Sequence, residues 1–593
     1  MSKHINLKAL TFKLLIGLFI SALIYSCANI GYPEGGPKDE ESPVVKLTNP
    51  PNFSTKFKGG KVNIYFNEFV QLKDITEKFI VSPPLDKKPS VNLRGESIYV
   101  DMGDSLKPNT TYTLDFADGI ADNNEGNPLG NFKYVFSTGD ALDSLNIQGH
   151  ALDAFSSLPL EKVQVFAYSN HQDSVPLTIV PDYVALTDSA GHFSLSNLKA
   201  GTYKLFALID GNRDYKYNGP GEIIGFFDTL LTPTAELFQK MDSISPDSSA
   251  LRTYTAFSPA DIHINLFEEA NPLLYLTDFK RPRREKLEFN FSYKRNDDLK
   301  IKFLEVESNN KSFLEESNVT KDSLSYWIAD SNIYKLDTLT AVLNYFKTDT
   351  TNQLVNYTDT LKLNFKNPKK AKQTKKQARN SKPKKPIYNF KSNIKSTQEL
   401  NKIIKFEFNE PLAHYMLDSI HLVKIVDTLE VAVPFTFEKD TALLRSYHLN
   451  MKLESETQYK LDIDSATFEN IYGIKSNVFS QKFKTKEREY YGKILLTVNH
   501  VEGPVIIQLI ENNKSENLIQ SIKINSDQIV TFDYLEPKTY IIKVIEDWNG
   551  NGKWDTGNYK LKRQPETVHY FRKEIKVRSN WDVEENIVLS PKH

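Results

Sequence analysis

Apolar and polar residues alternate with a period of two along much of the chain. Runs such as 62–66 (VNIYF) and 459–463 (YKLDI) show this alternation, and runs such as 163–168 (VQVFAY) stay apolar over the length of a strand. Glycine, proline, asparagine and aspartate separate these runs at short intervals, as they do in turns between strands. The pattern predicts an all-β protein made of tandem β-sandwich modules. By contrast, 233–244 (PTAELFQKMDSI) is expected to form a short connecting helix.

A duplicated pattern divides the chain into two halves. The segment 64–70 (IYFNEFV) matches 406–412 (FEFNEPL). Tyr112 and Tyr459 each lie six residues after a leucine and 24 residues before a phenylalanine. Equal spacing of the same residue types indicates two copies of one sandwich. Because each tyrosine follows a turn, we expect its hydroxyl to bond to the backbone upstream, as in the tyrosine corner of Greek-key sandwiches.

A second module type follows each copy of the first. Tyr203 and Tyr540 each end a leucine-to-tyrosine element, and a polar loop begins seven residues later, at Asp210 and Asp547. This shared spacing predicts a second pair of β-sandwiches. A further segment, 257–365, contains strand-like runs of its own and is predicted to be a fifth sandwich from its pattern alone.

Both module types resemble known families. The first is similar to the bacterial Ig-like domain of the SbsA type, which has an F-[NS]-E-P turn and a closing F-x-T strand, although Phe69 stands where the second copy has Pro411. The second resembles the transthyretin-like or carboxypeptidase regulatory-like sandwich with its TDxxGxFxxxxLxxGxY pattern. The first copy matches this pattern at Thr187, Asp188, Gly191, Phe193, Leu198, Gly201 and Tyr203. The second copy keeps Phe532, Leu535 and Tyr540 but lacks the glycine before the tyrosine. These resemblances imply a fold more than an activity.

The N-terminus has the composition of an export signal. Lysines precede an apolar segment, 14–25, which is too short to span a bilayer. Cys27, the chain's one cysteine, follows, so disulfides within the chain are excluded. The sequence 24–27 (IYSC) resembles the lipobox of Bacteroidota lipoproteins, which implies cleavage before Cys27 and acylation of its sulfur. The alternatives are a secretory signal with an unrelated cysteine and a signal anchor that is never cleaved.

These observations predict the following organisation. The expected segments are a signal peptide (1–26), a flexible tether (27–42), an Ig-like sandwich (43–140), a transthyretin-like sandwich (145–232), a sandwich of unknown type (250–365), a basic linker (366–387), a second Ig-like sandwich (388–487) and a second transthyretin-like sandwich (489–590). The acidic run 38–41 (KDEE) resembles the surface-export signal of Bacteroidota lipoproteins, which implies that the protein faces outward.

Charge narrows the classes of partner. The formal net charge of the chain is −1, while the segment 366–386 holds ten lysines and arginines and no acidic residue. Nucleic-acid binding is not expected, because this segment lacks aromatic residues that stack on bases and the signal exports the chain. A solvated spacer is favoured over a contact with anionic lipid headgroups or lipopolysaccharide phosphates.

Two polar loops offer oxygen atoms at alternate positions, as short Ca²⁺-binding loops do. The candidate metal ligands are Asp547, Asn549, Asn551 and Asp555 in one loop and Asp210, Asn212 and Asp214 in the other. Neither loop has an acidic residue at position twelve, where Asn558 and Gly221 stand. An ordinary polar turn is therefore favoured over a Ca²⁺ site, and no other cofactor is expected.

Catalysis is not indicated. The chain lacks the GxSxG, HExxH and GxxxxGK[ST] motifs, and its eleven histidines are scattered without ligand spacing. The carboxylate pairs Asp462–Asp464 and Asp115–Asp118 are more typical of solvated surfaces than of a glycosidase dyad. For Trp548, Trp554 and Trp581, packing within an aromatic-rich domain is favoured over binding of a sugar or protein.

The sequence therefore predicts a noncatalytic lipoprotein of the outer membrane, anchored through acylated Cys27 and exposed at the cell surface. The resemblance to Ig-containing lipoproteins of Bacteroidota implies a scaffold or binding subunit that contacts other outer-membrane proteins in an assembly or export complex. Two alternatives stay open, namely a glycan-binding or adhesive lipoprotein and a surface hydrolase.

Overall fold

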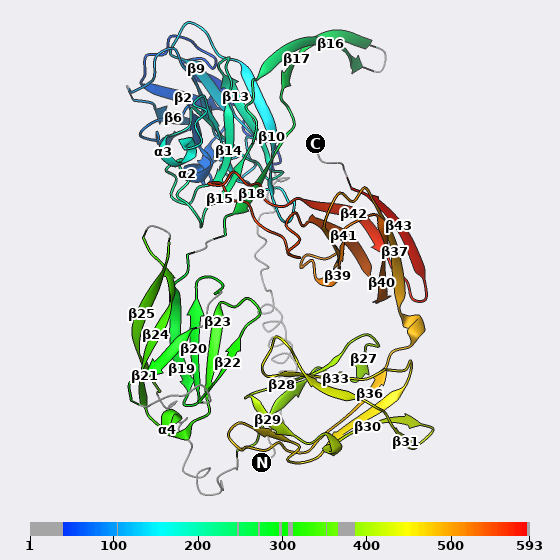
Figure 1. Cartoon of the computed structure of the whole chain (residues 1–593). Helices are drawn as coiled ribbons and strands as arrows, with labels where there is room; N and C mark the ends of the chain where they lie inside the picture. The colour runs from blue at the N-terminus through cyan, green and yellow to red at the C-terminus, as the bar shows by residue number, and fades with distance from the viewer. Residues whose placement is uncertain are drawn as a thin grey trace, which may run out of the picture.

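The computed structural model describes residues 39–103, 105–245, 248–270, 273–295, 299–305, 312–350, 353–365 and 386–589. Its regular structure is almost entirely β-strand and forms tandem β-sandwich modules, which confirms the predicted fold class (Figure 1). Five separate clusters of buried apolar side chains each fill one module. The signal peptide, Cys27, most of the tether and the basic linker lie outside the described residues.

The first module consists of a four-stranded sheet, β1-β2-β6-β5, a three-stranded sheet, β4-β7-β9, and the pair β3-β8. Its elements are β1 (Val45–Asn49), β2 (Lys61–Phe66), β3 (Val70–Leu72), α2 (Ile75–Lys78), β4 (Ile80–Ser82), β5 (Val91–Arg94), β6 (Ser97–Asp101), β7 (Thr111–Asp115), β8 (Ile120–Asp122) and β9 (Lys133–Ser137). In β2, Val62, Ile64 and Phe66 are buried and alternate with exposed or half-buried positions.

The fourth module repeats this topology. Its sheets β26-β28-β33-β32, β27-β36-β34-β30-β31 and β29-β35 match those of the first module, with β27 and β31 added at the edges of one sheet. The elements are β26 (Phe390–Ser392), β27 (Thr397–Gln398), β28 (Ile404–Phe408), β29 (Leu412–Tyr415), η1 (Leu417–Ser419), β30 (Ile420–Val426), β31 (Leu429–Ala432), β32 (Thr436–Lys439), β33 (Ser446–Asn450), β34 (Gln458–Ile463), β35 (Phe468–Asn470) and β36 (Phe479–Thr485).

Tyr112 and Tyr459 occupy equivalent places in these two modules. Both side chains are completely buried. The Lys107 N–H donates to the Tyr112 hydroxyl at 2.8 Å, and the Glu454 N–H donates to the Tyr459 hydroxyl at the same distance. Each hydroxyl therefore closes the turn that precedes its strand.

We expect Tyr459→Phe to destabilise the fourth module by about 1–2 kcal/mol, because it leaves the Glu454 N–H without its acceptor. Hydrogen exchange at the Glu454 amide should accelerate accordingly. Tyr447→Phe is the control, since the Tyr447 hydroxyl forms no hydrogen bond to the described part of the chain and its ring is also buried. Equal acceleration in the two variants would contradict the prediction.

The second module is one continuous seven-stranded arrangement, β12-β11-β14-β15-β18-β10-β13, folded over its own core. Its elements are β10 (Leu145–Asp153), β11 (Gln164–Tyr168), α3 (Val175–Thr178), β12 (Tyr183–Leu186), β13 (His192–Leu198), β14 (Lys204–Ile209), β15 (Ile223–Phe226) and β18 (Ile262–Glu268), with a hairpin of β16 (Thr234–Ser245) and β17 (Ser248–Ser258) before β18.

The strand β18 corrects a predicted boundary. It pairs in parallel with β10 and antiparallel with β15, so the second module extends to Glu268 rather than ending at 232. The third module accordingly starts later than the predicted 250. The parallel pairing joins the first and last strands of the module across an inserted hairpin, and local alternation in the sequence cannot show such a long-range pair.

The fifth module repeats the topology of the second. Its sheets are β39-β38-β41-β42 and β40-β37-β43, with β37 and β43 parallel as β10 and β18 are. The elements are η2 (Arg488–Tyr490), β37 (Gly492–Asn499), β38 (Val505–Glu511), β39 (Leu518–Ile524), β40 (Gln528–Leu535), β41 (Thr539–Glu546), β42 (Val568–Lys576) and β43 (Asp582–Val588). In both modules a tyrosine hydroxyl donates to a carbonyl four residues upstream, Tyr203 to Lys199 at 2.9 Å and Tyr540 to Glu536 at 2.8 Å.

The third module packs the sheets β19-β20-β23-β22 and β21-β24-β25 around a separate core. Its elements are β19 (Leu276–Arg283), β20 (Lys286–Phe291), β21 (Lys300–Phe303), β22 (Phe313–Ser317), β23 (Ser323–Ile328), α4 (Ser331–Tyr334), β24 (Thr338–Thr348) and β25 (Leu354–Asn364).

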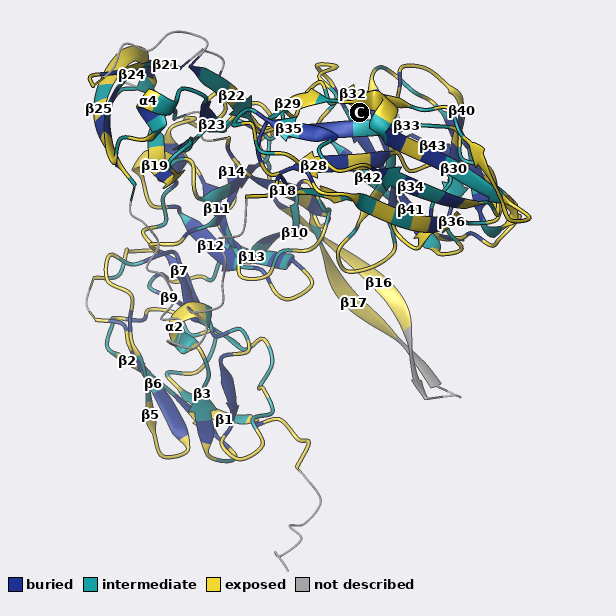
Figure 2. Cartoon of the chain, turned by 90° about the horizontal axis from the view of Figure 1, so that it is seen from below, coloured by how far each residue is buried: buried dark blue, intermediate teal, exposed yellow. Residues whose placement is uncertain are grey.

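The predicted helix at 233–244 is wrong. These residues form β16, which pairs with β17 in an antiparallel hairpin that projects from the second module (Figures 1 and 2). The segment contains several good helix formers, but its residues lie opposite threonines and aromatic residues of β17, such as Thr253, Tyr254 and Thr255. Cross-strand pairing with these residues outweighs the local helix propensity.

The third, fourth and fifth modules bring the chain back to the second, so these four modules lie around a ring (Figure 1). Contacts link the third module to the fourth, the fourth to the fifth, and the fifth to the second. The first module packs separately on the second, where Asn197 Nδ2 donates to Thr113 Oγ1 at 2.7 Å.

An ion-pair network links the fourth and fifth modules. Lys486 Nζ lies 2.6 Å from Glu399 Oε1 and 3.0 Å from Glu536 Oε1, and Lys538 Nζ lies 2.9 Å from the other Glu536 oxygen. The hydrogen bond from Lys538, assisted by Lys486, lowers the pKa of Glu536 to about 2. These two lysines together outweigh burial, which raises the pKa.

This shift predicts a pH-dependent stability. Because the folded pKa lies below the ordinary 4.5, Glu536 stabilises the fold above about pH 4.5, and the contribution is lost as pH falls towards 2. Glu536→Gln should therefore lower the melting temperature at pH 7 but have little effect near pH 2.5. Glu584→Gln, an exposed control, should change neither value. A Glu536→Gln effect that is constant with pH would contradict the prediction.

Candidate functional site

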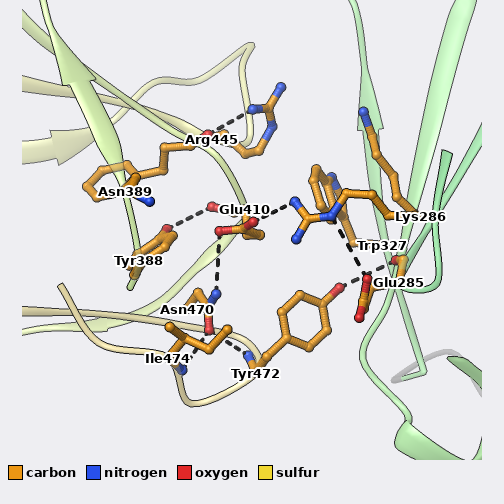
Figure 3. Close-up of polar contacts among 12 residues, drawn as sticks. Glu285, Lys286, Trp327, Tyr388, Asn389, Glu410, Arg445, Asn470, Tyr472 and Ile474 are labelled. Atoms are coloured by element: carbon orange, nitrogen blue, oxygen red, sulfur yellow. Dashed lines mark hydrogen bonds and ion pairs between the residues drawn. The ribbon is translucent and has the colours of Figure 1, made fainter. Parts of the chain in front are cut away.

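The fourth module contacts the third module at the turn that contains Asn409 and Glu410, here called the Asn-Glu turn (Figure 3). Glu410 is almost fully buried, and its Oε1 accepts a hydrogen bond from Arg283 Nη1 of the third module at 2.5 Å. Asn470 Nδ2 lies 3.5 Å from its other oxygen, and Tyr388 donates to its carbonyl at 2.7 Å. The Tyr472 hydroxyl donates to the Glu285 carbonyl of the third module at 3.4 Å.

A second cluster extends the same junction. Arg445 Nε of the fourth module lies 2.8 and 2.9 Å from the two carboxylate oxygens of Glu316 in the third. Trp327 Nε1 donates to Glu316 Oε2 at 2.8 Å. The Trp327 ring lies between Lys286 and Arg445, at 5.0 and 5.6 Å from its centroid, and is 1% exposed.

The matching turn of the first module has no such partner. Glu68 is equivalent to Glu410, and no ion pair among the described residues involves it. Burial raises the pKa of Glu68, and neighbouring Asp122 adds to the effect. Asp122 accepts four backbone N–H groups, from residues 124–127, at 2.6–3.1 Å. Phe69, next to Glu68, is 59% exposed, so this turn offers an acidic group beside an apolar one.

The fifth module contacts the second through a segment that we name the docking arm, residues 556–565, which leads from its polar loop towards β42. Tyr559 inserts between Phe206, Phe226 and Tyr217 of the second module, with ring centroids 5.5–6.1 Å apart. The Tyr559 N–H donates to Glu269 Oε1 at 2.5 Å, and Gln564 Nε2 donates to the Phe226 carbonyl at 2.9 Å. Residues 560–563 at the tip are exposed.

The polar loop 547–555 lies at the base of this arm. Asp547 follows β41 and is 2% exposed, and its Oδ2 accepts the Gly552 N–H at 2.7 Å. Its Oδ1 is buried and has no hydrogen-bond partner. The side-chain amides of Asn549 and Asn551 both lie 2.5 Å from Asp555 Oδ2. Three of the four residues predicted as ligands in this loop therefore contact one another, whereas Asp547 binds the backbone of Gly552.

Glu566, which the sequence analysis did not single out, also contacts this loop. It is 4% exposed, and its two oxygens accept the Trp548 N–H at 2.9 Å and the Asp555 N–H at 2.8 Å. Burial raises the pKa of Glu566, and the nearby Asp555 and Asp547 carboxylates raise it further. Position twelve of the loop holds Asn558 and no acidic residue, whereas Glu566 comes from beyond the docking arm.

The corresponding loop of the second module begins at Asp210. It has similar backbone turns, but fewer side-chain contacts link its candidate ligands. Asp210 accepts the Arg213 N–H at 2.6 Å with one oxygen and the Tyr215 N–H at 2.8 Å with the other. Asn212 and Asp214 are exposed. Glu222 is the counterpart of Glu566, because its Oε2 accepts the Asn218 N–H at 2.8 Å. In this loop Asp210 has partners on both oxygens, in contrast to Asp547.

Three histidines that are distant in the sequence form a row across neighbouring strands. His150 on β10 lies opposite His192 on β13 and His263 on β18, with ring centroids 5.4 and 5.7 Å apart. Asp261 Oδ1 lies 3.3 Å from His263 Nε2 and 3.7 Å from His150 Nδ1. The expectation that the histidines are scattered without ligand spacing is therefore wrong for His150 and His263, because strand register brings them together with Asp261, with one candidate ligand atom of each residue within 4.8 Å of the others.

The other candidate residues form no catalytic group. Asp462 is paired with Lys460 at 2.7 Å, and Asp115 with Lys133 at 3.1 Å, so these carboxylates are bound to lysines. Trp554 packs on Phe155 of the second module at a centroid distance of 5.1 Å. Trp548 and Trp581 are 44% and 58% exposed.

The topology shared by the first and fourth modules agrees with a family match. Residues 39–138 match the family of bacterial Ig-like domains. This match covers the first module and less than half of the chain. No curated protein matches the sequence.

Solved structures with tandem domains are similar over long stretches. Domains 1–6 of surface layer protein SbsC share 10% identity over 87% of this chain and 67% of that chain, with a TM-score of 0.14. The SGBP-B protein of a Bacteroides ovatus mixed-linkage glucan utilization locus, in complex with a heptasaccharide, shares 10% identity over 65% of this chain and 87% of that chain, with a TM-score of 0.17. Such TM-scores carry no inference about function.

In the described part of the chain, no helix has the length and apolar character needed to cross a membrane.

Proposed function

We propose that this chain is a noncatalytic scaffold, anchored in the outer membrane through acylated Cys27 and exposed at the cell surface, that holds partner membrane proteins of an assembly or export complex. The Ig-like first module and the tandem sandwich architecture support a structural or binding role. The sequence 24–27 and the tether after it support the anchor.

The β16–β17 hairpin carries the proposal. Leu237, Met241 and Leu251 are 76%, 59% and 58% exposed, and Met241 lies directly opposite Leu251. Phe238 and Tyr254, on the other face, are also partly exposed. An isolated two-stranded hairpin is marginally stable in water, and both edges of this one have unpaired backbone groups. Its apolar faces are expected to be covered by a partner protein, which would stabilise the hairpin.

The turn at Glu68, which forms no ion pair within the described part of the chain, offers a second contact for a partner protein. Its counterpart in the fourth module binds an arginine of a neighbouring module through Glu410. By the charge of Glu68, the first module is therefore suited to bind an arginine on a partner, with exposed Phe69 beside it. This module is the first one after the predicted tether in the sequence.

Affinity purification of the full chain from detergent-solubilised membranes tests the proposal. We expect integral membrane proteins to co-purify with the wild type and to fall at least tenfold in a hairpin variant with Leu237→Ser, Met241→Ser and Leu251→Ser. A matched control carries Leu429→Ser, Val478→Ser and Ile529→Ser, which are equally exposed apolar residues elsewhere. Equal recovery from both variants would contradict the role of the hairpin.

Other outcomes would support the alternative functions. Retention of the chain on polysaccharide, lost on substitution of exposed Trp548 and Trp581, would indicate a glycan-binding protein. Turnover of a polymer would indicate a surface hydrolase. An unmodified Cys27 thiol, detected by mass spectrometry, would overturn the proposed anchor.

A further inference from the structure

His150, Asp261 and His263 gather on the outer face of the second module, where its first and last strands meet. The strands β10 and β18 pair in parallel, with His150 directly opposite His263. His263 is exposed and alternates with buried Ile262 and Ile264, so it lies on the outer face of the sheet. Asp261 stands two residues before His263 and shares this face. Each of the three residues offers one ligand atom, and these atoms all lie within 4.8 Å of one another.

Hydrogen bonds do not account for this arrangement. Asp261 Oδ1 lies 3.3 Å from His263 Nε2 and 3.7 Å from His150 Nδ1. A charge-assisted N–H···O hydrogen bond is shorter, at about 2.7–2.9 Å. The His150 Nδ1 atom is buried and has no hydrogen-bond partner. Within the described residues, Asp261 forms no ion pair with a lysine or arginine. Two imidazole nitrogens thus face one carboxylate oxygen across distances that are too long for good hydrogen bonds.

These separations fit the ligands of a tetrahedral zinc ion. Zn²⁺ binds imidazole nitrogen at about 2.0–2.1 Å and carboxylate oxygen at about 2.0–2.2 Å. Two ligands of such a tetrahedron therefore lie about 3.3–3.5 Å apart. The observed distances of 3.3 and 3.7 Å from Asp261 Oδ1 are close to this value. Two histidines and one carboxylate are also a known set of three protein ligands for zinc, with water in the fourth position.

We propose that His150, Asp261 and His263 bind one Zn²⁺ ion and that this ion joins β18 to β10. The ligand atoms are His150 Nδ1, Asp261 Oδ1 and His263 Nε2. The side chains of Asp261 and His263 are 76% and 57% exposed, so water can reach the fourth position. His192, the next histidine of the row, is not among the ligands, because it lies outside the group of atoms within 4.8 Å and its Nδ1 faces Asp188 at 3.9 Å.

The position of the site gives the ion a structural role. β15 ends at Phe226 and β18 begins at Ile262, and the β16–β17 hairpin lies between them. Asp261 comes three residues after the end of β17, so the ion holds the chain where it returns from the hairpin to the sheet. Zn²⁺ stabilises the pairing of β18 with β10, because the unfolded chain does not bring the three ligands together. This role requires no partner protein and does not rest on the proposed scaffold function.

Zinc titration of the purified full chain, after treatment with EDTA and removal of the chelator, tests the site. We expect calorimetry to detect a Zn²⁺ site that Ca²⁺ and Mg²⁺ do not occupy, since these ions prefer oxygen ligands. Saturating Zn²⁺ should slow hydrogen exchange in β18 and β10 at least tenfold and leave exchange in the third module unchanged. Absence of binding at submillimolar Zn²⁺, or binding that leaves exchange in β18 unchanged, would overturn the proposal.

Substitutions in the histidine row identify the ligands. His150→Ala and His263→Ala should each weaken Zn²⁺ binding at least tenfold and abolish the protection of β18, because each removes one ligand. His192→Ala is the matched control, since its side chain lies in the same row and is 41% exposed, against 38% for His150.

The metal-free variants separate loss of a ligand from loss of the fold. Because the His263 side chain is 57% exposed, metal-free His263→Ala should show the same hydrogen exchange in β18 as the metal-free wild type. Full Zn²⁺ binding by His263→Ala, or an equal loss in His192→Ala, would overturn the assigned site. These outcomes are independent of the co-purification expected for the hairpin, because they are measured on the purified chain alone.

Discussion

Replacing Tyr559 with alanine is expected to release the docking arm from the second module. The Tyr559 side chain is 7% exposed, and its ring packs among three aromatic rings of the second module. Its hydroxyl also donates to the Asp173 carbonyl. Truncation of a buried aromatic side chain to alanine costs about 3–5 kcal/mol, because it removes apolar contacts and leaves a cavity.

This cost predicts a large change in protease sensitivity. When the arm opens and closes faster than trypsin cleaves it, the cleavage rate follows the population of the released arm. A loss of about 3 kcal/mol raises this population roughly a hundredfold. We therefore expect trypsin to cut Tyr559→Ala at the arm tip at least a hundredfold faster than the wild type. Leu561→Ala is the control, since Leu561 lies in the same arm and is 71% exposed. Similar rates for the two variants would show that Tyr559 does not hold the arm.

The fold class was predictable because its signals are local. Strand alternation, turn residues and the repeated spacing around Tyr112 and Tyr459 all lie within short windows of sequence. The shared sheet order of the first and fourth modules, and of the second and fifth, agrees with that repetition. The hairpin at 234–258 was not predictable in the same way, because β16 depends on residues of β17 rather than on its own propensity.

The candidate sites were only partly predictable, since they depend on contacts between distant residues. The alternation of oxygen-bearing residues from Asp547 to Asp555 was visible, but Glu566 lies beyond the arm and reaches the loop through tertiary structure. The histidine row requires the register of β10 with β13 and β18. The sequence did contain one signal for Glu566, because in the second loop Glu222 also follows the last candidate ligand.

The contacts between modules could not be predicted from the sequence. Glu410 lies in a recognisable Asn-Glu turn, but its partner Arg283 is 127 residues away in a module of unknown type. The copy at Glu68 has the same turn, and no ion pair within the described part of the chain involves it, so the turn alone does not determine what it binds. Duplication supplies two similar surfaces, and the neighbouring modules determine which of them is occupied within the chain.

Trp327→Ala is expected to weaken the junction between the third and fourth modules most strongly. Trp327 lies outside the apolar core cluster of the third module, and its ring is covered by Lys286 and by Arg445 of the fourth module. Alanine removes this ring and the hydrogen bond to Glu316, at a cost of about 3–5 kcal/mol. Arg445 then loses its aromatic neighbour but keeps its carboxylate partner.

Hydrogen exchange measured by mass spectrometry can locate this loss, which a single melting curve of a multidomain chain cannot. We expect faster exchange in β22 and β23 and in the segment 443–447 around Arg445, with no change in the fifth module. Trp327→Phe keeps an aromatic ring but removes the Nε1 donor and the five-membered ring of the indole, so its effect should be smaller than that of alanine. If Trp327→Ala accelerates exchange only within the third module, then Trp327 stabilises its own module and the ion pairs alone hold the fourth module in place.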